Sequence, residues 1–152
     1  MLFFKKRRKL KAIKEIILLW HSVCMKYVEI EKLSEPRPLV GTCCFFIGSI
    51  DAICQATKLN DKDFAEITVT LMIDMNFPLA VVQSIMTNFY GKNERVTFAF
   101  KAIKAGIDSL LKWYNTSFMD EDSTKVLSIQ ILEWYKKPNI SSNELTLFGI
   151  RS

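Results

Sequence analysis

Residues 39–50 read LVGTCCFFIGSI, a stretch of twelve residues without a charged side chain. On a helix, six apolar residues of this stretch and the following turn share one broad face: Cys43, Phe46, Ile47, Ile50, Ile53 and Cys54. A helix this apolar is usually enclosed by neighbouring helices. We therefore expect residues 39–57 to form the central helix of the core, with Gly48 allowing a neighbouring backbone to come close.

A narrower stripe on another side of this helix carries its polar residues. Asp51 and Gln55 share the stripe with Cys44, Gly48 and Lys58. A carboxylate that is buried in such apolar surroundings has a raised pKa and can act as a general acid or base. The presence of Gln55 and Lys58 favours a simpler interpretation, in which Asp51 and Gln55 form a solvated or hydrogen-bonded edge of the core helix.

The rest of the chain has the spacing of amphipathic helices separated by short breaks. Only five Gly and four Pro occur among the 152 residues, which leaves long uninterrupted segments. Apolar residues at steps of three and four predict helices over about residues 6–33, 61–75, 78–89, 93–114 and 123–137. Residues 67–73 also alternate like a strand, but an N-cap at Asn60 and the lack of an equally strong second strand favour a helix.

These elements predict an all-α fold, a compact single-domain bundle of about six helices around the apolar second helix. The basic N-terminal arm, residues 1–9, is expected to be partly frayed. Residues 10–137 are expected to form the helical domain. Residues 138–152 are expected to form an irregular C-terminal tail, because no helical period continues there.

The net charge of +5 is concentrated in one short segment. Residues 1–14 carry seven cations and no acid: Lys5, Lys6, Arg7, Arg8, Lys9, Lys11 and Lys14. The remaining residues carry 14 basic and 16 acidic side chains, so the body of the chain is close to neutral. This distribution argues against nucleic-acid binding by the whole domain, which requires a basic surface.

The N-terminal arm is the strongest local signal for a binding site. Two aromatic residues precede five consecutive cations in the segment Phe3, Phe4, Lys5, Lys6, Arg7, Arg8 and Lys9. Such a segment suits an anionic membrane surface, because aromatic side chains insert between lipids and cations attract the headgroups. Docking of a protein partner fits the same residues. Binding to nucleic-acid phosphates is a weaker alternative, and a terminus that only aids solubility is the simplest one.

The cysteines and the single histidine do not form a recognisable reactive site. Cys24, Cys43, Cys44 and Cys54 lie in apolar segments without a CxxC pair, and His21 is the only histidine. Their spacing does not fit a zinc site, and free buried thiols are typical of a reducing compartment. We expect no metal and no cofactor, and the sequence favours a binding protein over an enzyme.

Neither long apolar segment resembles a secretory or membrane-spanning segment. Lys14 and Glu15 interrupt the apolar run that follows the basic arm. Residues 39–50 fall short of the roughly 20 residues that span a bilayer. The cytoplasm is therefore the expected location, with the membrane surface as an option for the arm.

The expected function is protein interaction or regulation, with self-association into a homodimer as the leading form. The amphipathic first helix and the nearly all-apolar second helix offer more apolar surface than one chain is expected to cover. Peripheral membrane attachment through the basic arm is the alternative. A small enzyme or an apolar-ligand-binding domain ranks below both, because no reactive constellation can be read from the spacing.

Overall fold

The computed structural model describes residues 2–89 and 97–150, and these residues form helices without any strand. The elements are α1 (Leu2–Met25), the 3-10 helix η1 (Ile30–Ser34), α2 (Pro36–Ala56), α3 (Asp61–Asp74), α4 (Leu79–Phe89), α5 (Thr97–Asn115), α6 (Glu121–Lys136) and α7 (Ser142–Leu147). The predicted all-α fold is thus confirmed, and residues 67–73 are helical within α3. The structure adds η1 and α7 to the predicted helices.

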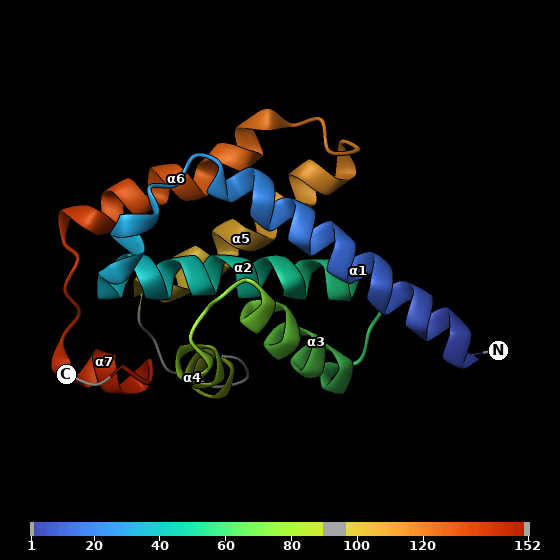
Figure 1. The fold of residues 1–152 in the computed structure, drawn as a ribbon, viewed down its shortest axis with the longest axis horizontal. Helices are drawn as coiled ribbons and strands as arrows, with labels where there is room; N and C mark the ends of the chain where they lie inside the picture. The colour runs from blue at the N-terminus through green and yellow to red at the C-terminus, as the bar shows by residue number, and fades with distance from the viewer. Residues whose placement is uncertain (1, 90–96, 151–152) are drawn as a thin grey trace.

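Helix α2 lies at the centre of the bundle. In Figure 1 it crosses the middle of the molecule, with α6 above it and α3 and α4 below it. Almost all of its side chains from Val40 to Cys54 are buried, which confirms the predicted core helix. Of the helices in the described ranges, α2 alone is long and apolar enough to cross a membrane, but 78% of its apolar window is buried within the bundle. The core helix of a bundle meets the same criteria of length and composition.

The start of α2 lies three residues before the predicted one. Pro36 is its first residue, and Pro38 lies in its first turn. The first amides of a helix have no intrahelical acceptor, so proline costs no hydrogen bond there. Arg37 ties this end to the end of α6, because its Nε donates to the carbonyl of Lys137 over 2.8 Å and its backbone N–H donates to that of Pro138 over 2.9 Å.

Two glycines allow α2 and α5 to cross with their backbones in contact. A Cβ on Gly48 would lie 2.2 Å from the carbonyl oxygen of Ile103, and a Cβ on Gly106 would lie 1.8 Å from that of Phe45. Both positions therefore exclude any larger residue without movement of a backbone. The close approach predicted at Gly48 is confirmed, and Gly106 is its counterpart on α5.

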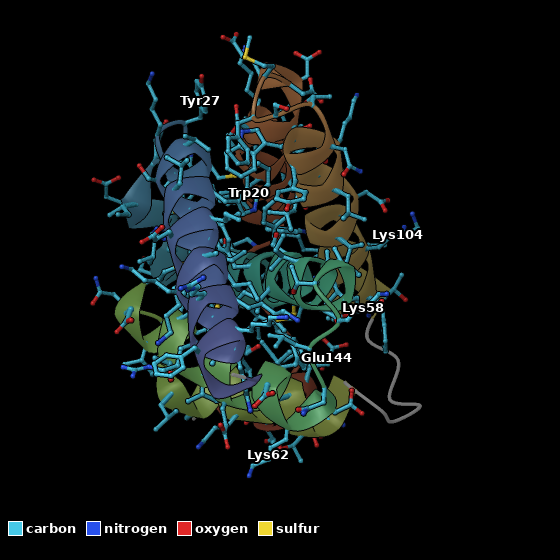
Figure 2. All side chains as sticks on the ribbon, turned by 90° about the vertical axis from the view of Figure 1, so that its right-hand side faces the viewer. Trp20, Tyr27, Lys58, Lys62, Lys104 and Glu144 are labelled. Atoms are coloured by element: carbon cyan, nitrogen blue, oxygen red, sulfur yellow. The ribbon has the colours of Figure 1, made fainter. Side chains whose placement is uncertain are left out.

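Helix α1 packs onto this crossing through Trp20, which lies between α1 and α5 in Figure 2. The indole Nε1–H donates to Oγ of Ser49 over 3.0 Å. The Ser49 hydroxyl in turn lies 3.0 Å from the carbonyl oxygens of both Phe45 and Gly106. The Trp20 ring also packs on Trp113, with 4.9 Å between ring centroids. One buried hydrogen-bonded cluster therefore joins α1, α2 and α5.

The N-terminal segment differs from its prediction. Residues 2–9 of the basic arm are the first turns of α1, which begins four residues before the predicted start near residue 6. The same helix ends at Met25, whereas the apolar spacing predicted that it would continue to about residue 33. The segment after Met25 forms η1 instead.

The C-terminal tail is more ordered than predicted. Residues 138–152 were expected to be irregular, but they contain α7. Ser141 caps this helix, because its Oγ accepts the backbone N–H of Glu144 over 3.3 Å. Phe148, which follows α7, is completely buried. The tail therefore packs onto the bundle.

Candidate functional site

The N-terminal turns of α1 form a charged end that extends beyond the other helices in Figure 1. The side chains of residues 4–8 are exposed, and Phe4 leaves 62% of its surface accessible. The side chain of Phe3, the other predicted docking aromatic, lies outside the described residues. Most of the predicted docking segment is thus accessible from solution.

The cations of this basic end point in different directions around α1, because successive side chains of a helix are rotated by about 100°. Lys6 precedes Ile13 by seven residues and therefore shares its core-facing side. Its Nζ lies 2.9 Å from Oδ1 of Asp63 in α3, and the Asp63 side chain is only 9% exposed. This ion pair ties the basic end of α1 to the start of α3.

A cleft of about 360 Å³ lies between this end of α1 and the connection from α2 to α3. Its lining contains four lysines from two parts of the chain, and we call it the lysine cleft: Lys5, Lys6, Lys9, Lys58, Leu59, Asn60 and Asp63. Lys6 is paired with Asp63. For Lys5, Lys9 and Lys58, no carboxylate lies within ion-pair distance in the described ranges. Three uncompensated ammonium groups therefore border one cleft.

Lys58 enters the cleft from the C-terminal end of α2. The backbone N–H of Leu59 donates to the carbonyl of Cys54 over 2.9 Å, and that of Lys58 donates to the carbonyl of Gln55 over 3.1 Å. These two bonds form a Schellman motif, in which the residue after the C-cap adopts the left-handed conformation. Lys58 has a φ of 59°, where glycine or asparagine is the usual residue.

The start of α3 closes the other side of the lysine cleft. Asn60 is the N-cap of α3, as predicted, and its Oδ1 accepts the backbone N–H of Asp63 over 2.8 Å. The Asp63 carboxylate is already paired with Lys6. The one acid in the lining thus leaves the other three lysines without a partner, and the cleft has a positive potential.

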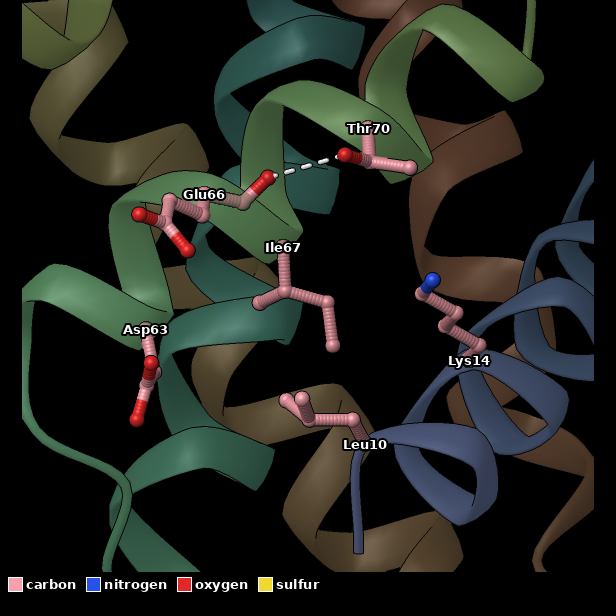
Figure 3. A pocket seen from close by; sticks show the side chains of 6 residues that line it. All are labelled: Leu10, Lys14, Asp63, Glu66, Ile67 and Thr70. Atoms are coloured by element: carbon pink, nitrogen blue, oxygen red, sulfur yellow. Dashed lines mark hydrogen bonds between the residues drawn. The ribbon is translucent and has the colours of Figure 1, made fainter. Parts of the chain in front are cut away.

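A second hollow, of about 160 Å³, continues along the same α1–α3 interface (Figure 3). Figure 3 shows Leu10 and Lys14 of α1 opposite α3, which contributes Asp63, Glu66, Ile67 and Thr70. Here the charge of the one lysine, Lys14, is balanced by Glu66, because the Asp63 carboxylate is paired with Lys6. The positive potential of the interface is therefore confined to the lysine cleft.

The predicted polar stripe on α2 is shorter than expected. Cys44 and Gly48 are buried, and only the end with Asp51 and Gln55 reaches the surface. Nε2 of Gln55 donates to Oδ1 of Asp51 over 3.0 Å. Burial raises the pKa of Asp51, the hydrogen bond from Gln55 opposes that rise, and the negative charge of Asp61 adds to it. This geometry is that of a hydrogen-bonded helix edge.

His21 and the cysteines do not form a nucleophilic site in the described residues. The His21 ring packs on Phe46 and Phe77, with 5.0 Å and 6.3 Å between centroids, and burial lowers its pKa. All four cysteines are free and buried. Burial raises the pKa of Cys54 to about 12, which keeps the thiol protonated and unreactive. No three His, Cys, Asp or Glu side chains gather in these ranges as a metal site requires.

A second accessible surface lies along α6. Ile129 and Leu132 are three residues apart, so they share a face of the helix, and they are 61% and 53% exposed. The segment from Tyr27 to Lys32 runs beside α6, because Lys125 lies over the Tyr27 ring at 5.8 Å and Lys32 lies over the Tyr135 ring at 5.2 Å. Its large apolar residues are also exposed, and we call the combined set the α6 apolar face: Tyr27, Ile30, Ile129, Leu132 and Tyr135.

Comparisons of the chain with protein families, with curated proteins and with solved structures found no match.

Proposed function

We propose that this protein docks peripherally on an anionic membrane surface through the basic end of α1. The observation that carries this proposal is the set of exposed cations on a projecting helix end, next to an exposed aromatic residue, Phe4. Each Lys or Arg near an anionic bilayer contributes about 1 kcal/mol of attraction. Several such residues, together with one inserted aromatic ring, are enough for reversible attachment.

The charge distribution favours a membrane over nucleic acid as the partner. The body of the chain has 14 basic and 16 acidic residues, so it provides no extended basic track along which a duplex could lie. A bilayer needs only one projecting basic end. We further propose a cytoplasmic location, because all four cysteines are free and the cytoplasmic leaflet carries anionic lipids.

Vesicle sedimentation tests this proposal. The protein should bind vesicles of phosphatidylcholine and phosphatidylserine at low ionic strength, release them at high ionic strength, and ignore pure phosphatidylcholine. The double variant Arg8→Gln/Lys11→Gln should bind several-fold more weakly. Its matched control, Lys62→Gln/Lys101→Gln, removes two exposed charges elsewhere and should bind like the original protein. Equal losses in both variants would refute docking through α1.

Self-association is a second candidate, and it is favoured by the α6 apolar face. The original reason for expecting it does not hold for α2, whose apolar surface is covered by its own chain. Exposed Ile129, Leu132 and Ile30 offer a separate patch, and a two-fold axis through such a patch would bury it against the same patch of a second copy.

Sedimentation velocity tests the second candidate. A dimer of the original protein should become a monomer in the variant Ile129→Gln/Leu132→Gln. The control variant Ile73→Gln/Leu79→Gln changes two other exposed apolar residues, on α3 and α4, and should stay dimeric. A monomeric original protein at high concentration would exclude self-association without affecting the membrane proposal.

A further inference from the structure

We propose that the lysine cleft binds a phosphate monoester, carried by the headgroup of a membrane lipid. This inference deepens the proposed membrane docking. Only the identification of the carrier as a lipid rests on that proposed function. It adds a selective site to what would otherwise be attraction between charged surfaces.

The cleft combines cations from distant parts of the sequence. Lys5 and Lys9 are four residues apart and share a face of α1, whereas Lys58 comes from the end of α2. Lys6 is paired with Asp63, and this ion pair joins α1 on one side of the cleft to the start of α3 on the other. A basic terminal segment that only attracts anions by charge would not need Lys58 and the start of α3 on the opposite side of a cleft.

The charge of the cleft fits an anion with more than one negative charge. Like charges at positions i and i+4 destabilise a helix, and Lys58 adds a third cation near that pair. A phosphate monoester carries a charge of about −1.5 to −2 at neutral pH and three acceptor oxygens. The three unpaired ammonium groups can each donate to one of these oxygens. The phosphate group of phosphatidylserine is a diester with a single negative charge, so it would bind the three ammonium groups more weakly.

The size of the cleft agrees with a headgroup. Its volume of about 360 Å³ is in the range of pockets that bind small ligands, and its lining includes Lys5, which follows the exposed Phe4 in the sequence. The cleft and the aromatic residue therefore lie at the same end of the molecule. A lipid held there by its headgroup would bring the N-terminal end of α1 to the bilayer surface.

Lys58 provides the sharpest variant, because its backbone conformation makes it safe to replace. Its φ of 59° suits glycine better than lysine, so Lys58→Gly should fold as well as the original protein. Lys62, four residues on, is also an exposed lysine but does not line the cleft. In Figure 2 it lies at the lower edge of the molecule, away from Lys58.

The test compares two vesicle preparations of equal total charge. One contains phosphatidylserine, and the other contains phosphatidylinositol 4-phosphate, which carries a phosphate monoester. The original protein should bind the second about tenfold more tightly, a difference of about 1.4 kcal/mol. Lys58→Gly should abolish this preference and leave binding to phosphatidylserine within about twofold, whereas Lys62→Gln should keep the preference. Equal binding to the two vesicles, or a preference that survives Lys58→Gly, would overturn the phosphate site and leave charge-driven docking intact.

A second experiment with a soluble phosphate monoester distinguishes failure of the phosphate site from failure of membrane docking. Inositol 4-phosphate should raise the melting temperature of the original protein and leave that of Lys58→Gly unchanged. This result in the absence of vesicle binding would refute the membrane function, retain the phosphate site and assign it to a soluble ligand. No vesicle binding and no thermal shift together would overturn both proposals.

Discussion

The two halves of α1 use the same helical geometry for opposite purposes. Ile13, Ile17 and Trp20 are completely or almost completely buried, and Trp20 is hydrogen-bonded at the crossing of α2 and α5. Lys6 lies on the same side of the helix as Ile13 and Trp20, but it meets a carboxylate instead of the core. A helix that is anchored along one half can thus carry a charged end into solution, since its stability comes mainly from the packed half.

The packed half of α1 rests on the crossing of α2 and α5, and that crossing depends most strongly on its glycine contacts. Gly106→Ala places a methyl group against the Phe45 carbonyl, so α2 and α5 must separate. We expect a loss of about 3 kcal/mol in the free energy of unfolding, measured by urea denaturation. The control Ala12→Gly, on the exposed side of α1, should lose about 1 kcal/mol through helix propensity alone. A stabilising Gly106→Ala would mean that the helices do not cross in contact.

Trp20→Phe tests the same half with a smaller change. It removes the indole N–H that donates to Ser49 and leaves part of the ring volume unfilled. Ser49 keeps a carbonyl acceptor, so its hydroxyl is not stranded. The free energy of unfolding should fall by about 2 kcal/mol, and near-ultraviolet circular dichroism should report the altered packing around Trp113. An unchanged midpoint would show that the cluster contributes little to the fold.

The sequence predicts the packed part of the molecule well because several local signals agree there. Asn60 is confirmed as the cap of α3, and the uncharged run at residues 39–50 is confirmed as the core. The start of α2 was predicted at residue 39, three residues too late, although proline is favoured in the first turn of a helix, where Pro36 and Pro38 lie. The spacing of apolar residues predicts which side chains are buried, but it does not locate the first and last residues of a helix.

The candidate site was predicted only in part, because a cleft depends on contacts that spacing does not encode. The five cations of the basic end were identified from the sequence, but their relation to Lys58, 49 positions after Lys9, comes from the fold. The pairing of Asp63 with Lys6 likewise joins residues far apart in the sequence and could not be predicted from spacing. In the tail, α7 was missed, although the spacing from Ser141 to Glu144 is a capping signal that could have revealed it.

The pH dependence of stability reports on His21, which lies on the packed half of α1. Burial lowers its pKa below the ordinary value of about 6.5, so the unfolded state binds more protons just below that pH. Stability should therefore decrease as the pH falls below about 6.5. Urea midpoints at neutral and mildly acidic pH measure this slope, which should flatten in His21→Gln, since the chain has no other histidine. A slope that persists in His21→Gln would assign the effect to another group.

Asp51 acts in the opposite direction at lower pH. Its raised pKa means that stability decreases as the pH rises through the carboxylate range.

The smallest effect on stability is expected at the basic end, and its sign is opposite to that of the core variants. Lys5→Gln/Lys9→Gln removes a like-charged pair at i and i+4 and a cation from the first turn of α1, where the helix dipole disfavours positive charge. The melting temperature should rise slightly at low ionic strength, by the equivalent of about 0.5 kcal/mol, and the gain should vanish at high ionic strength. The same variant should lose binding to the monoester-containing vesicles. Higher stability with weaker binding would mean that the charges are kept for a ligand at the expense of the helix. A loss of stability would instead make the basic end part of the fold, and the contrast between the two halves of α1 would fail.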